Sequence, residues 1–268
     1  GADWIWRVSP NHLDNIRQMR GFQVASGSTM RMTWISFDVE GKTGNIFQDR
    51  RVRQAFAHAI DREQLVRAVI GPGGRVLETA CYPRQFGCAT DVPRYEFSID
   101  KAKQLLAEAG QPNGFRVTLH SHASAPQPVI VEAVQGFLRR AGIDVRMQMH
   151  GNFKPFYEAI ERGEVPVAIS SYGNYNIGDV QIAVPLYFGG ESRDSVRDER
   201  LINAIREASR TSDAARRKQL LEMVTRTAIE ESYWVPLLLQ SVHYAYSSDL
   251  DIPLWDDENP RFYLAKWK

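Results

Sequence analysis

Apolar side chains recur along this chain with two alternating periods, one helical and one extended. In the segment that begins at Asp49, Val52, Phe56 and Ile60 recur at the spacing of one helical face, with polar residues between them. Asp49 and Asp61 each stand where an N-cap is expected, immediately before a run of helical periodicity. The pattern therefore predicts two short helices that meet near Asp61, with five apolar side chains buried: Val52, Phe56, Ile60, Leu65 and Val69.

Strand-like and helix-like segments then alternate through the middle of the chain. A strand, a helix and a second strand within about 35 residues form the β–α–β pattern, which predicts a parallel pair joined by a right-handed crossover. The predicted strands are 30–39, 115–122, 143–150, 165–173 and 233–247, and the predicted helices are 49–70, 98–110, 129–142, 152–163, 198–209 and 213–231. The middle of the chain is therefore expected to be an α/β unit. The two ends of the chain do not continue its alternation of strands and helices.

Five arginines lie on the helical segment at 49–70, which raises the question of a nucleic-acid surface. They fall off the apolar stripe and have acidic neighbours, so we expect a solvated face, with Arg50, Arg51 and Arg67 mainly exposed. The whole chain has 33 Lys and Arg against 32 Asp and Glu, whereas a nucleic-acid binder usually has a clustered basic excess. We therefore expect no nucleic-acid partner. We also expect no transmembrane segment, because no apolar run approaches the ~18 residues of a membrane span.

The two cysteines lie close together in the turn-rich stretch "CYPRQFGC", as Cys81 and Cys88. A metal site would need closer pairs and further ligands, and a C-x-x-C redox motif is absent. The spacing favours a disulfide, with a reduced structural pair as the alternative. A disulfide would indicate an oxidising compartment such as the periplasm or the cell surface.

Three ordered segments of the chain carry a family resemblance. The stretch "DRRVRQAFAHAIDREQLVRAVIGPGG" resembles a signature of the family 5 extracellular solute-binding proteins, the peptide-, dipeptide- and nickel-type binding proteins of ATP-driven importers. A second family segment is matched by Tyr95, Asp100, Ala102 and Lys103, followed by "LLAEAGQPNGF", and a third by "LRRAGIDV". The resemblance extends over nearly the whole chain.

The resemblance implies an architecture that this chain only partly fills. Family members are roughly twice as long and have two lobes around a cleft, so the chain resembles the later half of one. It implies a periplasmic-binding-protein-like α/β fold of type II, with the second lobe at 38–241. The segments 1–37 and 242–268 would be hinge strands and a tail that belong to an incomplete first lobe.

The resemblance also implies a function. It indicates the substrate-binding component of an ABC importer for peptides or a related small polar solute, bound between the lobes without catalysis or cofactor. The expected partners are the small-molecule or peptide ligand and a membrane permease. The expected location is the periplasm, after export by a signal peptide that this sequence does not contain. A ligand-sensing or regulatory domain that reuses the fold is the alternative.

Open α/β sheets bind ligands beyond the carboxyl ends of their strands. The loop "SYGNYNIGD" follows a predicted strand and offers Tyr172, Asn174, Tyr175, Asn176 and Asp179 as aromatic faces and hydrogen-bonding groups. In peptide-binding relatives an aspartate at this position takes the α-amino group of the ligand, and here Asn176 falls in that register. An amide brings no compensating charge, which argues against a plain peptide. A polar loop that only caps the strand end is the alternative interpretation.

Other side chains are weaker candidates. Trp34 could stack on a ligand where the chain crosses between lobes, although a buried hinge aromatic is the favoured interpretation. Arg193 could pair with a ligand carboxylate or be an exposed loop arginine. His120 and His122 are expected to be surface or core-edge residues, not ligands of a shared metal. The sequence contains no G-x-S-x-G, H-E-x-x-H, P-loop or dinucleotide-binding motif, so no catalytic residue is assigned.

Overall fold

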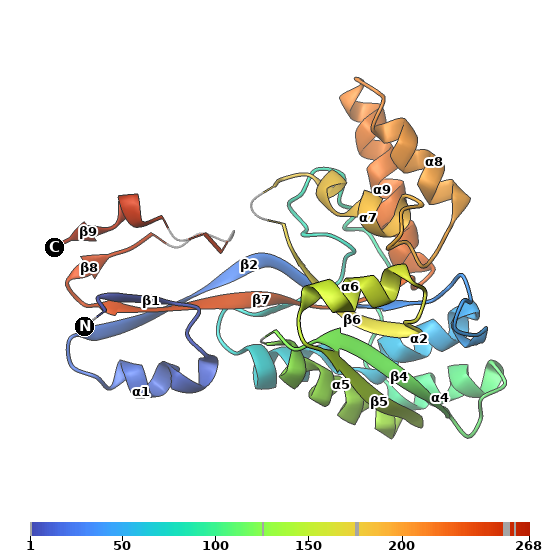
Figure 1. The fold of residues 1–268 in the computed structure, drawn as a ribbon, viewed down its shortest axis with the longest axis horizontal. Helices are drawn as coiled ribbons and strands as arrows, with labels where there is room; N and C mark the ends of the chain where they lie inside the picture. Colours follow the sequence, from blue (N-terminus) through green and yellow to red (C-terminus); the bar gives the residue numbers. More distant parts are fainter. Residues whose placement is uncertain (1, 125, 175–176, 254–257, 260) are drawn as a thin grey trace.

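The computed structural model describes residues 2–124, 126–174, 177–253, 258–259 and 261–268. It consists of an α/β lobe and an arm that carries both chain termini (Figure 1). Two long antiparallel strands, β2 (Phe22–Phe37) and β7 (Trp234–Ser247), run from the lobe into the arm. These two strands are therefore the covalent and hydrogen-bonded link between the two parts.

One mixed sheet extends through the molecule in the order β1-β7-β2-β6-β4-β5, with β3 beside β7. The strand β4 is parallel to both β5 and β6, which confirms the β–α–β unit, whereas β2 is antiparallel to β6 and β7. The remaining strands are β1 (Trp4–Trp6), β3 (Arg75–Val76), β4 (Phe115–His122), β5 (Ile143–His150) and β6 (Val167–Gly173), with β8 (Leu250–Asp251) and β9 (Lys266–Trp267) in a separate pair.

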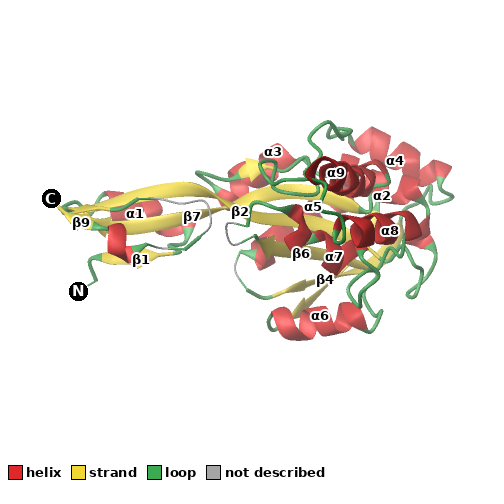
Figure 2. Ribbon diagram, turned by 90° about the horizontal axis from the view of Figure 1, so that it is seen from above, coloured by secondary structure: helices red, strands yellow, loops and turns green. Residues whose placement is uncertain are grey.

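The helices cover both faces of the lobe sheet. Figure 2 shows α5 with α2 and α4 on one face and α6 on the other, while α8 and α9 form an antiparallel hairpin beside them. The helices are α1 (Leu13–Arg17), α2 (Arg50–Ala59), α3 (Arg62–Leu65), α4 (Ile99–Glu108), α5 (Gln127–Arg140), α6 (Phe153–Glu161), α7 (Val184–Phe188), α8 (Glu199–Ala208) and α9 (Ala214–Glu230). Single turns at 10–12, 46–48, 66–70, 180–182 and 262–264 complete the described elements.

The helical segment that begins at Asp49 folds as predicted at both caps. The Asp49 carboxylate accepts from the Arg51 amide, and the Asp61 carboxylate accepts from the Gln64 amide. The predicted core positions Val52, Phe56, Ile60 and Leu65 are buried, but Val69 is only half-buried, so that prediction was wrong. The last turn is a π-turn over residues 66–70, which moves Ile70 into the inward position.

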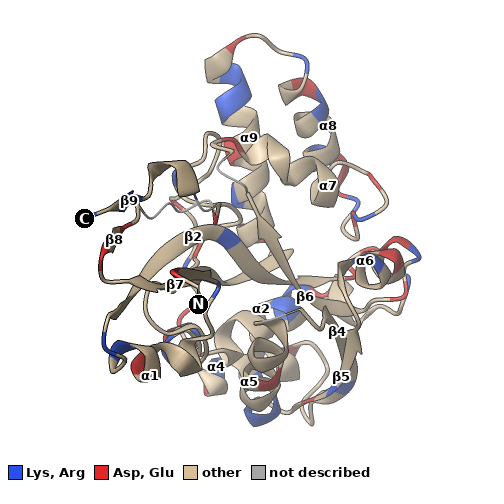
Figure 3. Cartoon of the chain, turned by 60° about the vertical axis from the view of Figure 1, so that its left-hand side comes forward, with Lys and Arg blue, Asp and Glu red and all other residues tan. Residues whose placement is uncertain are grey.

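The arginines of this segment divide into two groups. Arg50, Arg51 and Arg67 are exposed, as predicted, and Figure 3 shows basic and acidic positions interspersed along the helices. Arg53 and Arg62 are buried, so a solvated face for all five was wrong. A buried guanidinium needs several acceptors, and the periodicity could not show that carbonyl groups from distant segments surround these two.

The strand β2 begins at Phe22, eight residues before the predicted start at Met30. Apart from Phe22 and Val24, the residues before Met30 are small or polar, so the apolar alternation is too short to predict a strand. They form a strand because β7 supplies a continuous antiparallel ladder, with Phe22 opposite Ser247 and Ser28 opposite Ser241. Pairing with a distant strand here overrides weak local preference.

The lobe and the arm have separate hydrophobic clusters. The main cluster fills the lobe, whereas Val8, Leu13 and Ala245 form a small one in the arm, with Ile16 and Val24 against it. The arm also exposes large apolar side chains, namely Ile5, Trp6, Met19, Phe22, Phe262, Tyr263, Leu264 and Trp267. An exposed apolar surface of this kind indicates a surface made to be covered.

Cys81 and Cys88 form a disulfide, with their Cα atoms 5.7 Å apart, as predicted. The bond closes a loop that packs beneath α9, because Thr225 of that helix accepts from the Ala89 amide and donates to the Gly87 carbonyl. Across the described ranges, no helix has the length and apolar character to cross a membrane.

Candidate functional site

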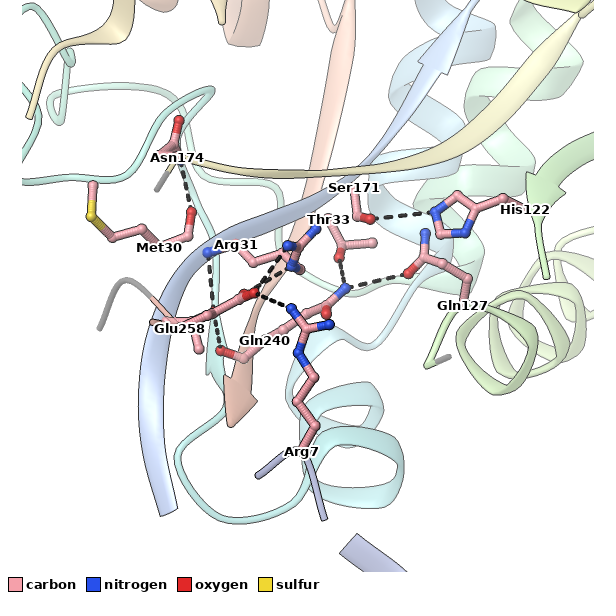
Figure 4. Close-up of polar contacts among 11 residues, drawn as sticks. Arg7, Met30, Arg31, Thr33, His122, Gln127, Ser171, Asn174, Gln240 and Glu258 are labelled. Carbon is pink, nitrogen blue, oxygen red and sulfur yellow. Dashed lines mark hydrogen bonds and ion pairs between the residues drawn. The ribbon is translucent and has the colours of Figure 1, made fainter. Parts of the chain in front are cut away.

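Polar side chains gather where β4 and β6 end, beside the crossing strands β2 and β7 (Figure 4). At the end of β4, His122 is 1% exposed, and its Nε2 lies 3.4 Å from the Ser171 hydroxyl of β6. Burial, together with the charge of Arg31, lowers the pKa of His122 to about 4. The ring is therefore neutral at pH 7, and its Nδ1 has no hydrogen-bond partner among the described residues.

The first turn of α5 is joined to both crossing strands. Gln127 is fully buried, and its Oε1 accepts from the Gln240 amide of β7 at 3.4 Å. The same amide donates to Thr33 Oγ1 of β2 at 3.0 Å, while Thr29 Oγ1 donates to the Gln240 carbonyl at 2.9 Å. The Gln127 Nε2 group has no partner among the described residues. The loop between β4 and α5 is thus held against the strands that lead to the arm.

Asn174 fastens the end of β6 to β2. Its Nδ2 donates to the Met30 carbonyl at 2.7 Å, and its buried Oδ1 has no partner within the described part of the chain. Tyr172 is half-buried, and its hydroxyl donates to the Ile182 carbonyl at 3.4 Å. The other two predicted residues of this loop, Tyr175 and Asn176, lie outside the described residues.

Asp179 has a structural engagement that the sequence did not reveal. Its carboxylate caps the turn at 180–182 by accepting from the Gln181 amide, and it forms an ion pair with Arg217 of α9 at 2.6 Å. The side chain therefore ties the loop after β6 to the helical hairpin.

The disulfide loop clamps the same segment. Gln85 Nε2 donates to the Ile177 carbonyl at 2.9 Å, and the Phe86 amide donates to the Gly178 carbonyl at 2.8 Å. The Val180 amide in turn donates to the Phe86 carbonyl at 3.1 Å. The disulfide thus supports the loop predicted to contact ligand, a link that the spacing of the two cysteines could not reveal.

Trp34 and Arg193 lie apart from this region. Trp34 is 1% exposed, stacked on Trp234 at 4.2 Å between ring centroids and with its edge toward Tyr187, so it is the buried aromatic that the sequence favoured. Arg193 pairs with Glu161 at 2.8 Å and lies 4.1 Å above the Tyr157 ring.

A cavity of about 20 Å³ lies between Arg193, Ser170 and Trp234. It has room for one water molecule and not for a solute. The Ser170 hydroxyl lines this cavity and has no partner among the described residues, which matches the need of a single buried water.

An arginine–glutamate cluster that the sequence analysis missed borders the end of β6. Arg31 of β2 makes two hydrogen bonds to the Glu258 carboxylate, at 2.8 and 2.9 Å, and Arg7 makes a third at 3.2 Å (Figure 4). A Cβ added at Gly173 would lie 2.7 Å from Arg31 Nη2, so only glycine leaves this guanidinium its place. The tail is thereby fastened to β2 by a part-buried, charge-assisted contact.

The described residues of this region offer amide, hydroxyl and imidazole groups but, among themselves, no arrangement for nucleophilic catalysis. His122 faces Ser171 at 3.4 Å, yet no carboxylate orients its other nitrogen among the described residues. Buried polar atoms that lack partners are unusual in proteins and are consistent with contacts completed by a ligand or by water. These side chains are therefore hydrogen-bond donors and acceptors that could be completed by a polar solute or by buried water.

The chain is similar to solute-binding proteins of several bacteria. It is 22% identical over 248 residues to the glutathione-binding protein GsiB of Escherichia coli strain K12, covering 88% of this chain and 47% of that protein. The corresponding protein of Salmonella paratyphi A is 26% identical over 249 residues, with 85% and 46% covered. The chain therefore spans about half the length of these curated relatives.

Solved structures show the same fold. The dipeptide-binding protein of Pseudoalteromonas sp. SM9913, in complex with Met-Leu, superposes with a TM-score of 0.79 at 21% identity, covering 100% of this chain and 54% of that one. NikA of Staphylococcus aureus, in complex with Ni(L-His)₂, superposes with a TM-score of 0.80 at 15% identity, covering 99% and 57%. At these identities the likeness establishes the mixed α/β fold.

A family profile accounts for most of the sequence. The profile of the bacterial extracellular solute-binding proteins, family 5 (middle), matches residues 1–194, which include the signature segment at Asp49, the disulfide loop and the β–α–β unit. Members of this family bind solutes and are not enzymes, in agreement with the absence of a catalytic motif from the sequence. The chain belongs to the family 5 bacterial extracellular solute-binding proteins.

Proposed function

We propose that this chain is part of the substrate-binding component of an ABC importer, which binds a peptide or a related small polar solute between two lobes. The observation that carries the proposal is a set of buried atoms that have no partner within the part of the chain that the structure describes, at or just beyond the ends of β4 and β6: His122 Nδ1, Gln127 Nε2 and Asn174 Oδ1. Open sheets bind ligands at such strand ends. Because the chain belongs to a solute-binding family, a bound solute is the expected partner of these atoms.

In this proposal, residues 38–241 are the second lobe, and residues 1–37 and 242–268 are hinge strands and a piece of the first lobe. Three observations support the division: the separate small cluster around Leu13, the exposed apolar side chains of the arm, and the coverage of about half of each relative. Closure of two lobes by a hinge buries most of a bound solute. The long strands β2 and β7 have the position that such a hinge requires.

The proposed location is the periplasm, with a membrane permease as the partner of the closed, loaded protein. The disulfide between Cys81 and Cys88 supports an oxidising compartment. The similar proteins bind glutathione, a dipeptide or a nickel complex, so we expect the ligand of this chain to be small and polar as well. We propose Tyr172, Tyr175 and Asn176 as the contacts that choose among such ligands.

A role in sensing uses the same geometry, with a signalling partner in place of the permease. Gene context separates the two roles, because a neighbouring permease and ATPase indicate transport, whereas a neighbouring kinase and regulator indicate sensing.

The full-length protein is purified in its folded state, and whatever compound co-purifies with it is released by unfolding. Mass spectrometry of that compound is the experiment that identifies the ligand. Titration calorimetry with that compound then compares the full-length protein with this chain. We expect micromolar binding by the former and loss of about half of the ~8 kcal/mol binding free energy in the latter, because one wall of the cleft is missing. Micromolar binding by this chain alone would contradict the two-lobe site.

Asn176→Asp in the full-length protein tests whether the ligand is a cationic amine at this position. If the ligand has no cationic group here, the new carboxylate has no partner and binding should weaken. If the ligand presents an α-amino group here, the substitution should raise the affinity. Tyr175→Ala and Asn176→Ala should each cost ~1–3 kcal/mol of binding free energy if these side chains contact the solute. Unchanged affinity in both variants would place the site elsewhere.

A further inference from the structure

A histidine pair lies near the carboxyl ends of β4 and β5, outside the polar network described above. His120 Nδ1 and His150 Nε2 are 3.1 Å apart, and the ring centroids are 5.3 Å apart. The strand register places His120 opposite Gln148 and His122 opposite His150, so the two rings meet diagonally across neighbouring parallel strands. Both rings are half-buried.

The pair is separate from His122, although all three histidines share one face of the sheet. Side chains two residues apart on a strand point to the same side, and here that side is covered by α6. The His122 ring packs on Phe153 at 4.0 Å between centroids, and its Nε2 faces Ser171 instead of another imidazole. His120 and His150 therefore act as a unit of two.

Both rings are held in the neutral form. Burial is the main cause that lowers the pKa of His120 to about 4, with His150 as the second cause. Burial also lowers the pKa of His150, where Arg162 adds to the effect and Glu164 opposes it. A neutral imidazole is the form that binds a metal ion, because no proton must leave first.

We propose that His120 and His150 form a two-histidine chelate for a divalent transition metal ion of the Cu²⁺, Ni²⁺ or Zn²⁺ class. With metal–nitrogen bonds of about 2.0–2.1 Å, two cis ligands lie about 2.8–3.0 Å apart at a right angle and about 3.3–3.4 Å apart at the tetrahedral angle. The observed separation of 3.1 Å falls between the two. The two nitrogens face each other as a hydrogen-bonded pair, so both rings must turn to direct their lone pairs at one ion.

The pair supplies only part of a coordination sphere. Within the described residues, no group of three or more His, Cys, Asp and Glu side chains is placed to hold a metal ion. Two or more positions are thus left to water or to donor atoms of a small molecule that arrives with the metal. Imidazole ligands favour Cu²⁺, Ni²⁺ and Zn²⁺ over the hard ions Mg²⁺ and Ca²⁺, and Cu²⁺ should bind most tightly.

Cu²⁺ titration of the full-length protein, stripped of metal with a chelator, tests the proposal. We expect one equivalent of Cu²⁺ to bind with nitrogen hyperfine coupling in electron paramagnetic resonance, and Zn²⁺ to compete for it. His120→Gln and His150→Gln should each weaken that equivalent by at least about tenfold, since ligand loss costs no less than loss of an outer partner. His12→Gln is the matched control, because His12 is a solitary exposed histidine.

Glutamine retains a donor and an acceptor, so these variants keep a hydrogen bond across the strands while they remove the metal ligand. Thermal unfolding of the metal-free variants confirms that they remain folded. Two results would overturn the proposal: Cu²⁺ affinity unchanged in both Gln variants, or an equal loss in His12→Gln. Because the titration needs no transported solute, its outcome is independent of the identity of the ligand in the cleft.

Discussion

Arg53→Met should destabilise the protein far more than its place in an arginine-rich, polar-looking segment suggests. The Arg53 side chain is 2% exposed and donates to three carbonyl oxygens: that of Phe47 at 2.6 Å, that of Gln48 at 3.0 Å and that of Glu231 at 2.7 Å. Glu231 is the C-cap of α9. The guanidinium therefore joins the start of α2 to the carboxyl end of a helix that lies far along the chain.

The magnitude follows from the acceptors left behind. A hydrogen bond to a charged donor contributes about 1.5–3 kcal/mol, and a buried carbonyl without a partner costs about 1–3 kcal/mol. The contact to Phe47 is fully buried, whereas those to Gln48 and Glu231 are partly buried, where water can replace some of the loss. Methionine retains much of the alkyl packing but no donor. One full and two partial losses give about 3–5 kcal/mol in the free energy of unfolding.

Urea unfolding followed by tryptophan fluorescence measures this difference, and Arg51→Met is the matched control. Arg51 is exposed, and its ion pair with Asp49 at 2.6 Å lies in solvent, where such pairs contribute little to stability. The Asp49 cap remains in both variants. A loss below about 1 kcal/mol for Arg53→Met, equal to that of Arg51→Met, would refute the view that this guanidinium is structural.

The remaining predictions concern the disulfide, pH and the arm. Cys81→Ser with Cys88→Ser should cost about 2.5 kcal/mol from loop entropy and speed amide exchange at Phe86 and Val180, whose amides make the backbone contacts between the disulfide loop and the loop after β6. Thiol titration of the unfolded, unreduced wild type should find no free thiol, and unchanged exchange at both amides in the variant would contradict the clamp. His122 has a pKa of about 4 in the folded protein against 6.5 in the unfolded chain, so the folded protein binds fewer protons between these pH values. The free energy of unfolding should therefore fall as pH drops from 6.5 to 4, by up to about 3 kcal/mol. A pH profile equally steep in His122→Gln would exclude this source. This chain alone should self-associate through the arm, where Phe262, Tyr263 and Trp267 are 65%, 80% and 63% exposed, and sedimentation velocity showing a monomer at high concentration would disprove it.

In the loop after β6, two side chains that were predicted to contact ligand have structural partners instead. Asp179 was predicted as a ligand contact, but its carboxylate is shared between a helical turn and Arg217. Asn174 was predicted for the same role, and its amide secures Met30 of β2. Both side chains shape the loop, so substitution of either would alter binding even if neither touches the solute. The polar composition identified the segment, whereas the partners decided the role of each group.

The sequence alone determined the local structure and the family. Helix caps at Asp49 and Asp61 lie where side-chain chemistry predicts them, because capping depends only on residues three or fewer positions away. The parallel β4 and β5 pair follows from the order of strand, helix and strand. The disulfide follows from the proximity of its cysteines in a turn-rich loop.

Only the tertiary structure decided the features that depend on distant partners. Burial of Arg53, extension of β2 to Phe22, the clamp by the disulfide loop and the pairing of His120 with His150 each join segments that are separate in the sequence. The physical reason is the same in every case. Hydrophobic periodicity records which face of an element is buried, whereas a polar group is tolerated inside only where another segment supplies its partner, and no local pattern encodes that partner.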